Sequence, residues 1–245
     1  MQNLSTLRTL GLGDVRNIGR DSLLAWMIFI PLLTGLVVRL LLPRLTPWLL
    51  SRYGFDLTPY DGLLMSYLVV LMTPILFGAV IGFLLLDERD DQTLLAMQVT
   101  PLPLSSYLLY RLSLPVGLSL VMNLLLFPLT GLGVLPLSAQ LPVVILAALQ
   151  APLMALFLGT FAENKVAGFA LTKGINAVLV LPTLSFFFPP VWQWLMALIP
   201  TFWPLKLFWV LLAGGNGWGY FFVGVIFQVG LLLILMRRFE RVLHR

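Results

Sequence analysis

The chain has 245 residues, of which 60% are hydrophobic and only 10% are charged, and its mean hydropathy is +0.99. Soluble domains carry about 25% charged residues, so this composition excludes an ordinary globular protein. The apolar runs approach the roughly 20 residues that a membrane-spanning helix needs, and the ten-residue alternation of a membrane β-barrel is missing. The predicted fold class is therefore an all-α membrane protein with six transmembrane helices.

Cysteine content and charge exclude further classes. The chain has no cysteine, so it forms no disulfide and no cysteine-ligated metal site. The bases that give a net charge of +5 lie at the ends of apolar runs and do not form one basic stripe, so we expect no nucleic-acid partner. Membrane lipids are the expected surroundings instead.

Residues 1–21 precede the first apolar run and are too polar for a cleavable signal peptide. Apolar side chains recur in this segment at helical spacing, which predicts an amphipathic N-terminal helix along the membrane surface. Three glycines weaken this prediction, and the alternative is a disordered basic leader. The apolar positions are Leu4, Leu7, Val15 and Ile18, and the glycines are Gly11, Gly13 and Gly19.

Six apolar runs predict the membrane spans. The first contains Pro31, a predicted kink, and ends near Arg39, whose charge either reaches the headgroups or contacts a substrate. A polar, proline-bearing loop is expected over 43–61, with aromatic residues at interface depth. The predicted spans are 22–42, 62–86, 105–129, 143–162, 171–188 and 218–236, and a short loop over 131–142 precedes the fourth.

The segment 87–104 interrupts the apolar pattern with acids and prolines. Within it, Gln92 to Val99 is mainly apolar on one side of a short predicted helix, which Asp90 or Asp91 caps and Pro101 ends. A solvated linker has no need of an apolar side, so we interpret this helix as a docking site for a soluble partner. The alternative is an acidic, solvated linker.

Two further breaks follow. The segment from Ala162 to Gly174 is either a charged loop or a tight turn followed at once by the fifth span. The segment 189–215 interleaves tryptophan with proline, and neither of its apolar pieces is long enough to cross. It predicts two short interfacial or re-entrant helices on the outer face, because prolines break the run and tryptophans anchor at headgroup depth.

The bases predict the orientation. With both termini in the cytoplasm, eleven basic residues face inward and four face outward, as the positive-inside rule favours. The inner set is Arg8, Arg16, Arg20, Arg89, Arg111, Lys165, Lys173, Arg237, Arg238, Arg241 and Arg245, and the outer set is Arg39, Arg44, Arg52 and Lys206. The segment 87–104 then lies in the cytoplasm, where a soluble partner can reach it.

The sequence offers no catalytic or energy-coupling site of its own. His244 is the only histidine, and HExxH, GxSxG and the phosphate-binding GxxxxGK[ST] motif are missing, so no enzyme activity, metal or nucleotide is expected in this chain. Ion coupling needs ionisable groups near the midplane, and spans two to six carry none at depth. The deep polar residues are uncharged and form either interhelical hydrogen bonds or a weakly polar pathway: Thr73, Asn123, Gln150, Asn176 and Thr183.

The run GFLLLDERDDQTLLAMQVTPLPLSSYLLYR resembles the segment between the second and third spans of ABC-2-type transporter permeases. In that family an acidic pair, a Thr-Leu step, a short helix and a TPL turn form the coupling helix. An N-terminal elbow ending in Arg20-Asp21, six spans and short outer helices are similar over nearly the whole chain. The segments NKVAGFALTK and IPTFWPLKLFW look most like the fluoroquinolone export permease branch of drug exporters.

The resemblance implies an ATP-driven exporter of a hydrophobic or amphipathic small molecule, a drug or lipid-like compound, in a prokaryotic plasma membrane. Two permease chains, identical or paired with a relative, are driven by two cytoplasmic ATPase subunits, which bind ATP and magnesium. The implied ATPase contacts are Glu88, Asp91, Thr93, Leu94, Leu95, Met97, Val99 and Pro101, with Pro103 stiffening the return and a weaker contact at Glu163, Asn164 and Lys165. Gln92 departs from the glycine often expected in relatives.

Two other functions stay open at this point. The first is a passive channel or an ion-coupled carrier, against which the missing deep charges count. The second is a membrane scaffold that binds a partner through the same segment and transports nothing.

Overall fold

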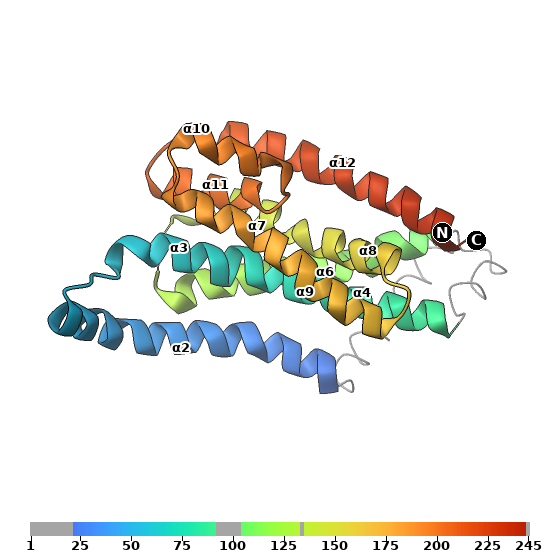
Figure 1. The fold of residues 1–245 in the computed structure, drawn as a ribbon, viewed down its shortest axis with the longest axis horizontal. Coiled ribbons are helices and arrows are strands. Elements are labelled where there is room, and N and C mark those ends of the chain that lie inside the picture. Colours follow the sequence, from blue (N-terminus) through green and yellow to red (C-terminus); the bar gives the residue numbers. More distant parts are fainter. Residues whose placement is uncertain (1–21, 92–103, 133–134, 244–245) are drawn as a thin grey trace.

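The structure, a computed structural model, describes residues 22–91, 104–132 and 135–243. In these residues the chain is helical without a strand, and six helices are long and apolar enough to cross a membrane, as predicted (Figure 1). The amphipathic elbow predicted for 1–21 and the centre of the predicted coupling helix lie outside the described residues. The six candidate spans are Phe29–Tyr53, Thr58–Asp90, Ser106–Thr130, Leu137–Phe161, Lys165–Phe187 and Trp218–Val242.

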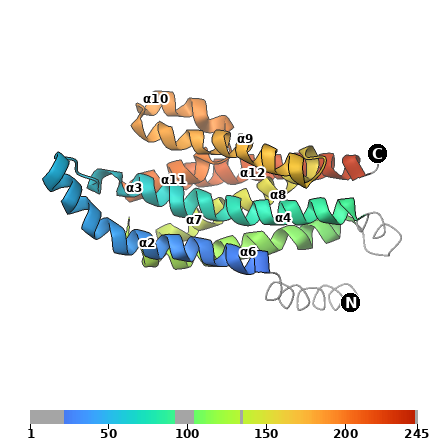
Figure 2. The same ribbon diagram turned by 60° about the horizontal axis from the view of Figure 1, so that its bottom comes forward.

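The first span, α2 (Ser22–Tyr53), is longer than predicted. Residues 43–53 were expected in a loop, yet Pro43 and Pro47 lie inside the helix, which bends along its length (Figure 2). A proline removes one backbone hydrogen bond and bends a helix without ending it when the surrounding turns stay helical. Arg39 donates to the carbonyls of Pro128 and Leu129, at 3.3 and 3.2 Å, and so caps the end of the third span.

The second span combines three helical segments. It passes from α3 (Asp61–Met65) through a π-helical stretch, η2 (Ser66–Met72), into α4 (Thr73–Asp90), and a short 3-10 turn, η1 (Thr58–Tyr60), precedes it. The wide turns end where Pro74, which has no N–H, cannot donate to a carbonyl one turn earlier. The span therefore contains an irregular turn near its middle.

The next spans begin earlier than predicted. After α6 (Leu104–Thr130), the fourth span starts at Leu137 and consists of α7 (Leu137–Ala148) and α8 (Gln150–Phe161), so Pro142 lies in a helix and not in a loop. The helix is interrupted at Leu149, three residues before Pro152, which again lacks the donor for a regular bond. The fifth span, α9 (Lys165–Leu184), starts directly after a tight turn, the second of the two alternatives above.

The second half of the segment between the fifth and sixth spans packs into the bundle. The whole segment contains η3 (Ser185–Phe187), α10 (Pro190–Gln193), η4 (Trp194–Leu198) and α11 (Phe202–Leu212), before α12 (Trp218–Leu243). Trp192 and Trp194 are exposed, as surface anchors would be, whereas Trp203 is only 6% exposed. The tryptophans of this segment were expected to anchor at headgroup depth, but Trp203 is enclosed by protein, because α11 packs between α7 and α12 and its Phe202 and Phe208 belong to the core.

The closest helix packing joins α4 and α8. A Cβ atom on Gly78 would lie 2.3 Å from the carbonyl oxygen of Ala151, and one on Gly82 would lie 2.9 Å from the Cβ of Leu158. Gly78 and Gly82 are four residues apart and so share one face of α4, where they let the backbone of α8 approach. Inside a membrane there is no hydrophobic driving force between helices. Faces of small residues stabilise helix association instead, because they allow close van der Waals contact.

We predict that Gly78→Ala weakens this packing. The added methyl group meets the backbone of Ala151, which cannot rotate away, so we expect a loss of about 1–3 kcal/mol of stability. Gly117→Ala on α6 is the matched control, since its Cβ would meet nothing within 4 Å. Thermal unfolding of the purified chain in detergent compares the two, and equal midpoints would contradict the assignment.

Candidate functional site

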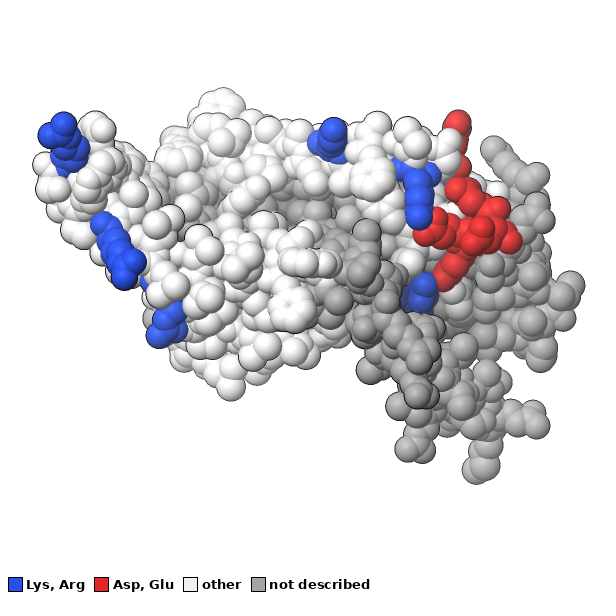
Figure 3. All heavy atoms as spheres, turned by 90° about the horizontal axis from the view of Figure 1, so that it is seen from below, with Lys and Arg blue, Asp and Glu red and all other residues white. Residues whose placement is uncertain are grey.

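Three consecutive residues at the end of α4, Asp87, Glu88 and Arg89, each reach a different neighbouring helix. We call these residues and their partners on α6, α8 and α9 the charged junction. Acidic side chains gather at this end of the molecule, whereas most of the face in view is uncharged (Figure 3). The predicted docking segment directly follows α4, so the junction lies at the end of the helix that leads into it.

Glu88 connects α4 to α6. Its carboxylate accepts a hydrogen bond from the hydroxyl of Tyr107 at 2.8 Å and pairs with the guanidinium of Arg111 at 2.5 Å. The side chains of Glu88 and Arg111 are only 17% and 13% exposed. Charge-assisted bonds that are shielded from water are stronger than surface pairs, so this contact fixes the two helices that flank residues 92–103.

Arg89 caps the end of α8. Its guanidinium donates to the carbonyl oxygens of Gly159, Ala162 and Glu163, at 3.1, 2.7 and 2.6 Å. The last carbonyls of a helix have no partner within the helix, and a cation there also meets the negative end of the helix dipole. The fork of donors on arginine satisfies several such carbonyls at once, which lysine cannot do.

Asp87 connects α4 to α9. Its carboxylate pairs with the ammonium group of Lys165 at 2.7 Å, and the two side chains are 36% and 52% exposed. Asn164 caps α9 by accepting a hydrogen bond from the backbone N–H of Ala167 at 3.0 Å. The three residues of the predicted secondary contact thus lie at the junction: Glu163 through its carbonyl, Asn164 as a helix cap and Lys165 in an ion pair.

The predicted ATPase contacts are only partly described. Glu88 lies within the junction, and Asp91 is exposed and forms the C-cap of α4. The remaining six fall outside the described residues and stay predictions: Thr93, Leu94, Leu95, Met97, Val99 and Pro101. The described ends of α4 and α6 leave 92–103 to connect them, and both ends belong to the junction.

The five predicted pathway residues are spread over four helices. Thr73, Asn123, Gln150 and Thr183 are buried, and Asn176 is half-buried. Thr73, Gln150 and Thr183 donate to the backbone carbonyls of Leu68, Pro200 and Val180, respectively. No hydrogen bond joins any two of the five, all of which the structure describes. Within the described chain, both polar atoms of the Asn123 side chain are buried without a partner. Hydrogen bonds therefore do not link these residues into one polar site.

Sequence reasoning overlooked Gln228. Its side-chain amide donates to the carbonyl of Pro200 at 3.3 Å, and the amide of Gln150 donates to the same oxygen at 3.1 Å. The fourth and sixth spans thus each donate a hydrogen bond to the same carbonyl of the loop before α11. A glutamine in the middle of an apolar span was the available signal.

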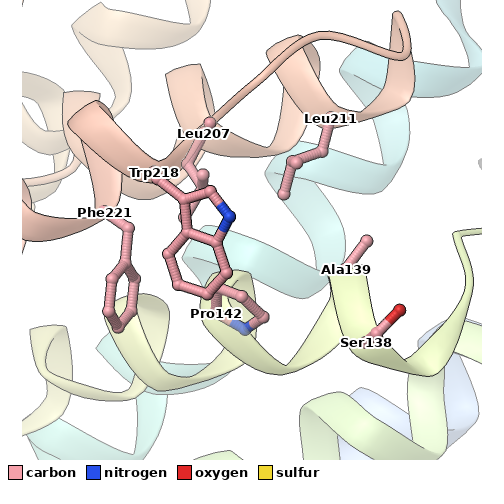
Figure 4. Close-up of a pocket in the computed structure, with 8 residues that line it drawn as sticks. Ser138, Ala139, Pro142, Leu207, Leu211, Trp218 and Phe221 are labelled. Atoms are coloured by element: carbon pink, nitrogen blue, oxygen red, sulfur yellow. The ribbon is translucent and has the colours of Figure 1, made fainter.

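An apolar pocket lies at the opposite end of the bundle. Its volume is about 210 Å³, and it is bounded by Ser138 and Pro142 of α7, Leu207 of α11, and Trp218 and Phe221 of α12 (Figure 4). The indole of Trp218 and the ring of Pro142 both line this pocket. In the described ranges, no group of three His, Cys, Asp or Glu residues could bind a metal ion.

The fold defines a multi-pass, all-helical membrane protein. The chain belongs to the family described as fluoroquinolones export permease protein Rv2686c-like, whose model matches residues 14–236. It is 31% identical over 238 residues to the fluoroquinolones export permease proteins Rv2686c and MT2760 of two Mycobacterium tuberculosis strains, H37Rv and CDC 1551. These alignments cover 96% of this chain and 94% of each relative. No solved structure matches the chain significantly.

The comparisons confirm the resemblance to export permeases that the segments around Lys165 and Trp203 indicated. The chain is accordingly a membrane transport protein. Its place in the broader ABC-2 class stays a prediction.

We predict that Arg89→Met destabilises the junction. It leaves three carbonyls at the end of α8 without their donor, which costs about 1–3 kcal/mol. Arg44→Met, the same change on an exposed side chain at the opposite end, is the control. Thermal unfolding of the purified chain provides the comparison, and the prediction is wrong if the Arg44 variant unfolds at the same temperature as the Arg89 variant.

Proposed function

We propose that this chain is the membrane subunit of an ATP-driven exporter of amphipathic drugs of the fluoroquinolone type. The family and its relatives support drug export, because both are named for it. The energy would come from separate ATPase subunits, since the sequence has no phosphate-binding loop. Those subunits would bind ATP and magnesium, and this chain would hold no cofactor.

The charged junction is the observation that supports coupling to an external motor. Residues 92–101 follow α4 and precede α6, and the pair Glu88–Arg111 joins these two helices at their ends. Arg89 and Asp87 extend the same connection to α8 and α9. A force applied by an ATPase to the docking segment would therefore reach four spans together and would not bend one helix alone.

The proposed assembly contains two permease chains, identical or related, and two ATPase subunits on the cytoplasmic side. It lies in the plasma membrane of a prokaryote with both termini in the cytoplasm, as the distribution of bases favours. The junction then faces the ATPase. Glu163, Asn164 and Lys165 lie beside it and offer a second contact.

An ion-coupled carrier is less well supported. Its mechanism needs an ionisable side chain that takes up an ion near the midplane. The deep polar residues of the spans are amides and hydroxyls, and Gln150 already donates to the carbonyl of Pro200. A scaffold without transport does not agree with membership of a permease family.

We predict that the double substitution Leu94→Asp and Leu95→Asp abolishes association with the ATPase. Two charges placed in an apolar contact without partners cost far more than such a contact contributes. The measurement is co-purification of a co-expressed ATPase with the tagged permease. The variant should insert into the membrane at the normal level, because the segment lies outside the spans.

The double substitution Gln92→Asp and Gln98→Asp is the matched control. It adds the same two charges to the same segment at positions that are already polar. We expect it to retain the ATPase. Equal retention by both variants would show that the apolar side of this segment does not dock the ATPase.

Glu88→Gln distinguishes transmission from docking. The substitution weakens the pair with Arg111, so we expect the ATPase to co-purify normally while drug-stimulated ATP hydrolysis falls by about fivefold or more. Asp56→Asn, on an exposed acid of the loop between α2 and η1, should change neither quantity. Loss of co-purification in the Glu88 variant would instead place Glu88 in the ATPase contact itself.

A further inference from the structure

A long groove runs beside α12 and consists of two hollows that share Ile234 and Arg238. The first hollow has a volume of about 370 Å³ and lies between α8, α9 and α12. Apart from Gln150 at one end and Arg238 at the other, its side chains are apolar. The second hollow, of about 510 Å³, lies at the charged end, where Thr160 faces three arginines, Arg237, Arg238 and Arg241. One groove is thus apolar along most of its length and basic at one end.

The basic end is held open by packing. Phe239 is fully buried, and a Cβ atom on Gly159 would lie 2.8 Å from its ring, so the end of α12 lies tightly against α8. The guanidinium of Arg238 lies 4.5 Å from the centre of the Phe161 ring, a cation–π contact at the boundary between the two hollows. Arg237 and Arg241 lie within one turn of Arg238 on the same helix.

The polar groups at this end lack counterparts. In the described part of the chain, no acidic side chain pairs with any of the three arginines, and the buried hydroxyl of Thr160 has no hydrogen-bond partner. Arginine side chains bind phosphate in a forked arrangement, and a threonine hydroxyl can donate to a phosphate oxygen. An anion with several oxygen atoms would satisfy all of these groups at once.

The length of the groove matches one leaflet of a bilayer. The α12 residues that line it run from Leu231 to Val242, about 16 Å at ~1.5 Å per residue, close to half of the roughly 30 Å hydrocarbon core. Gln150, at the apolar end, lies in the middle of the fourth span, Leu137–Phe161. Phe161, Val178 and Ile234 on the lips are exposed, so the groove opens to the side, toward lipid.

From these observations we propose that the groove binds one anionic phospholipid from the leaflet at the junction end. The phosphate lies among Arg237, Arg238, Arg241 and Thr160, and an acyl chain occupies the apolar hollow between α9 and α12. Basic pockets between membrane helices favour anionic headgroups in this way. The lipid would fill the space between α9 and α12 beside the charged junction.

Native mass spectrometry of the purified full chain tests the proposal. Phosphatidylglycerol and phosphatidylcholine with identical acyl chains are added in turn, and we expect one tightly held phosphatidylglycerol at concentrations where phosphatidylcholine does not bind. The double substitution Arg238→Gln and Arg241→Gln should weaken that binding by about tenfold or more. Arg44→Gln with Arg52→Gln removes two exposed arginines at the opposite end and should leave it unchanged.

A second variant tests the apolar part without changing the charge. Val178→Trp fills the hollow from an exposed position on its lip, so it should also lower phosphatidylglycerol binding while the chain still folds. Equal binding of the two lipids, or no loss in either groove variant, would overturn the proposal.

Evidence for either of two other occupants of the groove would also overturn the lipid proposal. If a fluoroquinolone displaces phosphatidylglycerol in competition, the groove is a substrate site. Because the chain has no cysteine, Ile234→Cys introduces a single thiol, and efficient disulfide formation between copies in the membrane would show that a second permease covers the groove. The lipid proposal predicts neither result and is independent of which ATPase drives transport.

Discussion

The backbone contact between α4 and α8 is the constraint on which the rest of this structure depends. Gly78 and Gly82 remove the side chains that would separate the two helices, and α8 approaches until its carbonyl at Ala151 fills the space. With the helices this close, Arg89 at the end of α4 reaches the final carbonyls of α8. A wider spacing would leave those carbonyls without this donor, at a cost of about 1–3 kcal/mol.

The charged contacts between helices and the uncharged polar residues of the interior lie in different parts of the molecule. Charges are concentrated where α4, α6, α8 and α9 end, and they pair across helices or satisfy backbone carbonyls. The interior holds amides and hydroxyls, of which Gln150 and Gln228 bind one carbonyl at Pro200. In such a transporter, the joined helix ends can receive a force from outside, which suits an external source of energy. The weakly polar interior suits amphipathic cargo.

Hydropathy alone predicted the six spans, because each must cover the hydrocarbon core with apolar side chains. It misplaced the ends, because Pro43, Pro47 and Pro142 were expected to lie in loops, whereas all three lie inside helices. It also missed the burial of Trp203 and the pairing of Glu88 with Arg111. Those features arise from contacts between different helices, and the periodicity within one helix does not reveal such contacts.

Transport in sealed vesicles tests the central claim most directly. The chain is reconstituted with its co-purifying ATPase, oriented with the ATPase outside, and uptake of a fluoroquinolone into the lumen is followed with and without ATP. The account predicts uptake against a gradient that requires both ATP and the ATPase. Accumulation by the permease alone in ATP-free vesicles, or uptake that follows an imposed proton gradient, would contradict it.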